Sequence, residues 1–74
     1  MVNPADQLID AIYDHAPPQR IESILREVVD EVVEREIEPG WFDLVGIIGG
    51  VAFLVIRYQW WPTGWHYRII NPNN

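Results

Sequence analysis

The sequence predicts a mainly α fold: an N-terminal amphipathic helical hairpin, then one transmembrane helix, then a short extended aromatic C-terminal tail. Three observations predict it. Apolar residues recur at helical spacing through most of residues 4–37, residues 44–56 contain no polar side chain, and aromatic residues frame that apolar run on both sides. We therefore expect an acidic helical hairpin at 1–40, a candidate transmembrane helix at 41–61 and an extended tail at 62–74.

The composition narrows the classes of function. The chain has 74 residues, a net charge of −6 and no cysteine. A chain of this length buries only about 60% of its unfolded surface, so we expect it to need lipid or other protein chains. The missing cysteines exclude disulfides and thiolate metal sites. All eleven acidic side chains lie in residues 1–43, and because such a surface repels phosphate, no specific nucleic-acid partner is predicted.

Residues 4–15 are predicted to form the first helix. Asn3 and Pro4 fit the N-cap and first-turn positions, and apolar residues follow at three- and four-residue spacing. The opposite side carries carboxylates one turn apart: Asp6, Asp10 and Asp14. Because carboxylates at this spacing diverge and no loop ligands follow them, they indicate a solvated helix face rather than a metal site.

A second helix is predicted from Pro18 to about Ile37, before the stop signal Glu38-Pro39-Gly40. Its apolar stripe spans about five turns. Four residues of this stripe are expected to dock on a partner: Ile21, Leu25, Val28 and Val32. The simplest arrangement is an αα-hairpin with the first helix, and the alternatives are packing on another protein or on a lipid surface.

The segment from Trp41 to Trp61 is predicted to cross a membrane as one helix. At 1.5 Å per residue it would reach roughly 31 Å, about the thickness of a bilayer's hydrocarbon core. Four residues are expected to act as anchors at the membrane interfaces: Trp41, Arg57, Trp60 and Trp61. Arginines on the C-terminal side favour an orientation with the C-terminus inside.

Three glycines in that segment predict close helix packing. Gly46 and Gly50 form a small-xxx-small pair on one helix face, and Gly49 widens the groove beside them. We expect another helix to pack there, either from a partner protein or, by self-association, from a second copy of the chain.

Two alternatives for the same segment do not need a membrane. In the first, Gly49-Gly50 is a two-residue turn between strands at 41–48 and 51–58, since valine and isoleucine favour strands. In the second, the segment is a buried core helix. Neither arm of the hairpin alternates apolar with polar residues, and the helix is apolar around its circumference, so either form requires other chains to cover it.

Catalytic signatures are missing from the sequence. His15 ends the first helix and is expected to cap its carbonyls, while His66 lies outside the apolar run with no second ligand nearby. No phosphate-binding loop, zinc-ligand spacing or carboxylate pair occurs. We therefore predict no enzyme activity, no cofactor and no metal site.

Together these observations favour a small single-pass membrane protein with a structural role. It would be an accessory subunit of a larger membrane complex or a component of a membrane-containing virion, with other protein chains and the bilayer as partners. The first alternative is a soluble oligomeric binding or assembly module in which residues 41–61 form a buried interface hairpin or helix. The second is a holin-like protein that permeabilises membranes through self-association of the span.

Overall fold

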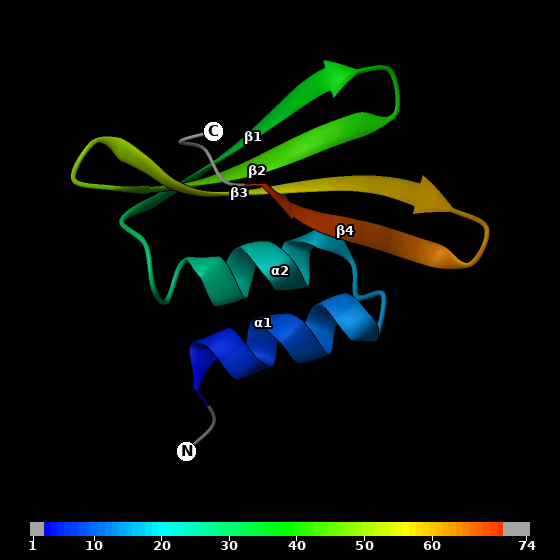
Figure 1. The fold of residues 1–74 in the computed structure, drawn as a ribbon, viewed down its shortest axis with the longest axis horizontal. Coiled ribbons are helices and arrows are strands. Elements are labelled where there is room, and N and C mark those ends of the chain that lie inside the picture. Colours follow the sequence, from blue (N-terminus) through cyan, green and yellow to red (C-terminus); the bar gives the residue numbers. More distant parts are fainter. Residues whose placement is uncertain (1–2, 71–74) are drawn as a thin grey trace.

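The second half of the chain is an antiparallel sheet of four strands. The computed structural model describes residues 3–70, and Figure 1 shows the helices followed by a meander of strands. In chain order the elements are α1 (Pro4–Tyr13), α2 (Pro18–Leu25), β1 (Glu31–Glu38), β2 (Trp41–Ile48), β3 (Val51–Trp61) and β4 (Gly64–Ile70). The strands lie in the order β1-β2-β3-β4, so each strand pairs with its neighbours in sequence.

The predicted mainly α fold is therefore wrong, and residues 41–61 follow the hairpin alternative. β2 and β3 are joined by Gly49-Gly50, whose φ angles are +59° and +79°. Positive φ at both central residues is what a type I′ hairpin turn requires, and glycine adopts it without steric cost. The valines and isoleucines on either side favour strands because their branched side chains pack well on a pleated sheet.

The membrane expectations are corrected by the same observation. Within residues 3–70, every helix is too short or too polar to cross a bilayer. The apolar run at 44–56 is instead divided between two strands and their turn. The transmembrane helix is thus wrong, and with it the predicted single-pass membrane localisation with the C-terminus inside.

The second predicted helix is also corrected, because α2 ends at Leu25 and residues 31–38 form β1. Val32 and Val33 fit a helical stripe, but β-branched residues fit a strand at least as well. Antiparallel pairing with β2, for example Val33 opposite Val45, decides in favour of the strand. The expected αα-hairpin is therefore present in a shorter form.

Both ends of the described chain agree more closely with the sequence. The first helix is confirmed: α1 begins at Pro4, and Oδ1 of Asn3 accepts a hydrogen bond from the Ala5 N–H at 2.9 Å. The extended tail is ordered as β4, which pairs with β3. Residues 71–74 of that predicted tail lie outside the described residues.

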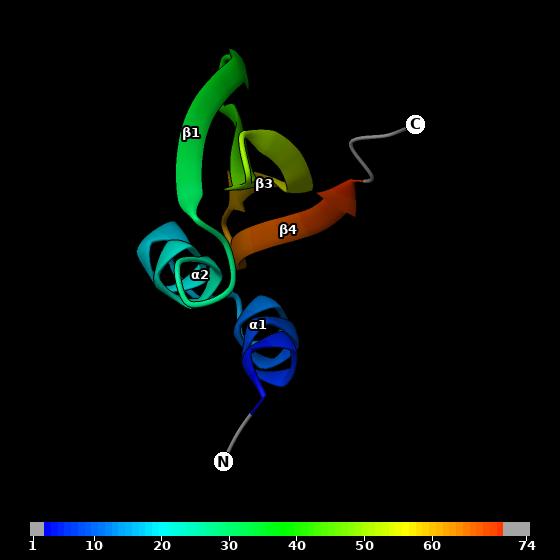
Figure 2. The ribbon, with the colours of Figure 1, turned by 90° about the vertical axis from the view of Figure 1, so that its left-hand side faces the viewer.

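Both helices lie on the same side of the sheet (Figure 2). The largest fully buried side chains come from α2 and from the two central strands: Ile21, Leu25, Leu44 and Ile56. The Tyr67 hydroxyl of β4 donates a hydrogen bond to the carbonyl oxygen of Ala16, between the helices. The core therefore lies between α2 and one face of the sheet. We call the opposite face, which no described element covers, the outer face.

Candidate functional site

The outer face consists of three rows of side chains that cross all four strands. The register places one residue of each strand in each row. The aliphatic row is Val33, Val45, Val55 and Ile70; the arginine row is Arg35, Asp43, Arg57 and Arg68; the tryptophan row is Glu38, Trp41, Gln59 and His66. Because directly paired residues share a face of the sheet, the register alone fixes these groups.

The aliphatic row is apolar surface that no helix or strand within residues 3–70 covers. Its four side chains are only half-buried, and in Figure 2 neither helix lies over this side of the sheet. An antiparallel sheet with one solvated face normally carries polar side chains there. A continuous apolar band across four strands is therefore an unusual solvent-facing surface, and contact with another molecule would remove it from water.

The arginine row contains one salt bridge, between Arg57 and Asp43, and two further arginines that form none within residues 3–70. The Arg57 Nε–H donates to Asp43 Oδ1 at 2.9 Å, and its Nη2 donates to Oδ2 at 3.3 Å. The hydrogen bond to Asp43, which is only 8% exposed, raises the pKa of Arg57. Arg35 and Arg68 lie on the two edge strands and form no salt bridge with any residue in 3–70. Their guanidinium groups are available to a partner.

A groove of about 390 Å³ opens beside the tryptophan row. Trp41 and Trp61 line it and are 37% and 50% exposed, and the Trp61 Nε1–H donates to Gln59 Oε1 at 2.8 Å. Arg57 and Arg68 line the same groove. Indole rings and guanidinium groups are the side chains most enriched in protein interfaces, because they combine large apolar area with directed hydrogen bonds.

Charge is distributed unevenly between the outer face and the rest of the chain. Glu31 lies two residues before Val33 on β1, so it is on the outer face next to the aliphatic row. With it the face carries three acidic side chains (Glu31, Glu38 and Asp43) and the three arginines of its middle row. The remaining sequence contains eight acidic side chains and two arginines. The entire net charge of −6 therefore belongs to the remainder, and the outer face is neutral.

The three glycines expected at a helix interface lie in the β2–β3 hairpin. Gly46 is in β2 on the helix side of the sheet, where an added Cβ would be 3.1 Å from Cγ1 of Val29. Gly49 and Gly50 form the turn, and the Gly49 N–H donates to Asp30 Oδ2 at 2.8 Å. These glycines allow close packing and a tight turn within the chain itself.

The expected membrane anchors are divided between the two faces. Trp41, Arg57 and Trp61 come together at the groove on the outer face. Trp60 lies on the helix side, where its ring centroid is 5.0 Å from that of Trp65. Alternation along β3 separates Trp60 from Trp61, because successive side chains of a strand point to opposite faces.

The expected docking stripe on the second helix is used mostly inside the protein. Ile21 and Leu25 are fully buried in the core, and Val32 is buried on the helix side of β1. Val28 is 53% exposed in the link between α2 and β1. The sheet therefore occupies most of the stripe that we expected a partner to cover.

The two histidines join the helical connection to the β3–β4 turn. Their ring centroids are 4.7 Å apart, and the Thr63 hydroxyl lies 2.7 Å from His66 Nε2. His15 Nδ1 is 3.0 Å from the carbonyl oxygen of Trp65. In residues 3–70 no three histidine or carboxylate side chains are placed to hold a metal ion. These contacts fasten α1 to the end of the sheet.

Sequence reasoning missed Arg35, Arg68 and Asp43 as members of one surface. Arg35 fell in the predicted second helix, Arg68 in the extended tail and Asp43 near the start of the predicted transmembrane helix. A usable signal was present, since Asp43 lies two residues after Trp41, and Arg57 lies two residues before Gln59. Residues two apart share a face only if the segment is a strand.

In comparisons with known proteins, no protein-family model, curated protein or solved structure matches the chain.

Proposed function

We propose that this protein is a non-catalytic interaction module that joins an assembly by docking its outer face on another protein chain. The observation that carries the proposal is the aliphatic row, which crosses all four strands on the face that no helix or strand within residues 3–70 covers. Burial of apolar surface is the main favourable term in protein association. A face that a packed core already holds in place can dock without the entropy cost of ordering a flexible segment.

The side chains around that row support a protein partner over a nucleic acid. Nucleic-acid surfaces require an excess of positive charge, because the affinity comes mainly from neutralising phosphates. The outer face has equal numbers of acids and arginines, and the chain as a whole has a net charge of −6. Exposed Trp41 and Trp61 beside Arg68 instead match the aromatic and arginine content of protein interfaces.

The groove itself supports a binding role rather than catalysis. Among its lining residues, His66 is the side chain best suited to general base chemistry, and its Nε2 is already hydrogen-bonded to Thr63. The groove is lined by neither serine nor cysteine that such a base could activate. Its carboxylate, Glu38, lies near Arg57 and favours the charged form of that guanidinium.

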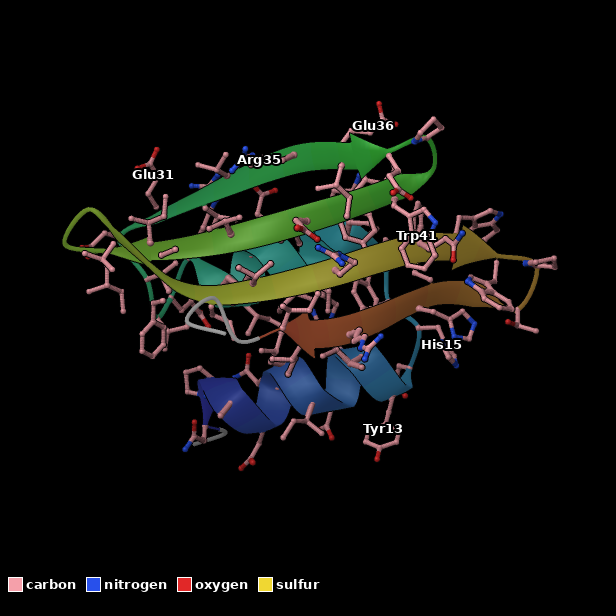
Figure 3. The ribbon with its side chains drawn as sticks, turned by 45° about the horizontal axis from the view of Figure 1, so that its top comes forward. Tyr13, His15, Glu31, Arg35, Glu36 and Trp41 are labelled. Atoms are coloured by element: carbon pink, nitrogen blue, oxygen red, sulfur yellow. The ribbon has the colours of Figure 1, made fainter. Side chains whose placement is uncertain are left out.

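Site-specific photo-crosslinking tests the proposal with a matched control. A benzoylphenylalanine replaces Trp41 on the outer face in one variant and Tyr13 on α1 in the other, expressed in the native host. Both positions are exposed aromatics, and they lie on opposite sides of the molecule (Figure 3). We expect a discrete protein adduct from position 41 and none from position 13. No adduct at position 41, or adducts only from position 13, would contradict the proposal.

A further inference from the structure

We infer that the occupant of the outer face is a second copy of this chain, docked about a two-fold axis so that two sheets pack face to face. This inference rests on the proposed function and specifies its partner. Three features of the face support a second copy: its size, its neutrality and the equal number of charges that it leaves unpaired.

The size of the face suits a small symmetric interface. Four strands of about eight residues, spaced about 4.8 Å apart, give a flat footprint of roughly 500 Å². Side-chain relief makes the accessible area larger than the footprint, which brings it to the lower end of standard interfaces, roughly 600 Å² per partner. Two sheets pack with their strands within about 30° of each other and interdigitate their inner rows. Interfaces at this lower end are typical of weak or transient complexes, so we expect a dimer whose dissociation constant is in the micromolar range.

Neutrality makes the outer face the favourable surface for self-association. Outside it the chain has eight acidic side chains and two arginines. Two copies that met through α1, which carries Asp6 and Asp10 and no basic residue, would bring like charges together, which is unfavourable within a Debye length of about 8 Å at physiological ionic strength. Docking through the outer face instead places the acidic surfaces on opposite outsides of the dimer, as far apart as the fold allows.

The charges that are left over on the face are balanced in number. Asp43 and Arg57 form a salt bridge with each other. Arg35 and Arg68 then remain without a salt bridge in residues 3–70, and Glu31 and Glu38 remain likewise. In an isologous interface the same patch supplies both sides. The two arginines of each copy can therefore form ion pairs with the two glutamates of the other copy. A different partner would need an independently neutral, apolar surface of the same shape.

Sedimentation velocity on the purified full chain is the first test. The chain has a mass of 8.6 kDa, and we expect the weight-average mass to approach twice that value as the concentration rises from about 1 to 200 µM, the range that brackets a micromolar dimer. A chain that stays monomeric through this series overturns the inference, whatever the variants below do.

Charge reversal then tests whether the outer face is the dimer surface. One variant combines Arg35→Glu with Arg68→Glu, and the other combines Glu31→Arg with Glu38→Arg. All four positions are exposed, and circular dichroism checks that each variant folds. We expect each variant alone to be monomeric at concentrations where the wild type is dimeric, and an equimolar mixture to form a heterodimer. Both variant chains remain net negative, so general attraction between them does not explain a heterodimer.

A control variant makes the same change of charge elsewhere. Asp10→Arg with Asp14→Arg alters two exposed positions at the end of α1 and should leave the wild-type dimer in place. If this variant dissociates the dimer, or if the mixture of outer-face variants stays monomeric, the inference fails. The crosslinked product separates this failure from that of the proposed function. An adduct at position 41 with a different protein keeps the proposed function and overturns self-docking, whereas no adduct overturns both.

Discussion

Asp43 and Arg57 face each other across β2 and β3 and are joined by two hydrogen bonds at the centre of the outer face. The two hydrogen bonds to the buried carboxylate fix the guanidinium in the row between the aliphatic row and the groove. A fork-shaped arginine bonded in this way is pre-organised, so little side-chain freedom is lost when a partner contacts it. The pair therefore links the stability of the sheet with the shape of the candidate binding surface.

The first prediction concerns that pair. Asp43→Ala should lower the urea midpoint of unfolding clearly, because it removes a buried hydrogen-bonding partner of Arg57. Arg35→Gln removes a charge from the same row but breaks no ion pair, so it should leave the midpoint unchanged within error. A double-mutant cycle with Arg57→Gln measures the coupling. Additive effects of Asp43→Ala and Arg57→Gln would show that the pair does not contribute to stability.

The second prediction concerns the close approach at Gly46. A Cβ at this position would lie 3.1 Å from Cγ1 and 3.5 Å from Cγ2 of Val29. Gly46→Ala should therefore destabilise the fold by about 1–2 kcal/mol through overpacking. Val29→Ala in the Gly46→Ala background should recover part of the loss, although the same change destabilises the wild type. Denaturant unfolding of the four proteins checks this, and no recovery in the double variant would refute the steric explanation.

The third prediction concerns the turn between β2 and β3. Gly50 has a φ of +79° with open space around its Cα, so backbone strain rather than a clash decides which residues fit. Gly50→Val should cost about 1–2 kcal/mol, the penalty for holding an ordinary residue in a left-handed conformation. Gly49→Asn should be close to neutral, since Asn-Gly is a preferred type I′ pair. Thermal unfolding compares the two variants, and equal losses would contradict this account of the turn.

How much of this fold is readable from the sequence depends on the element. The start of α1 can be predicted from local sequence, because Asn3 as N-cap and Pro4 as first helical residue act on the first turn alone. The possible turn at Gly49-Gly50 can be predicted in the same way, because the positive φ is a local requirement. The end of α2 cannot be predicted from local sequence. Val32 and Val33 fit both a helix and a strand, and their pairing with β2 selects the strand.

The candidate site was harder to predict than the fold. Its arginine row brings together residues from 35 to 68, and only the register of all four strands aligns them. A change of register by one residue would move every side chain of a strand to the other face. The sequence-based assignment of residues 41–61 to one helix therefore did not predict this surface, even though Trp41, Arg57 and Trp61 had all been singled out as membrane anchors.

The last prediction concerns stability at alkaline pH. Burial raises the pKa of Tyr58 above its ordinary value of 10.0, and the hydrogen bond that it donates to Glu34 raises it further. Burial raises the pKa of Tyr67 as well. At a pH above about 10, the unfolded chain loses these two protons while the folded chain keeps them. The folded state then binds more protons than the unfolded state, so stability must fall as pH rises.

Urea unfolding at pH 7, 10 and 11 checks the effect, with Tyr13 as the control. Tyr58→Phe and Tyr67→Phe remove the titrating hydroxyl, so each should shift stability by a constant amount near neutral pH and make the alkaline decline shallower. Tyr13 is 79% exposed, and its replacement by phenylalanine should leave the slope of stability against pH unchanged. If the decline above pH 10 is equally steep in all three variants, ionisation of the two buried tyrosines is not its cause.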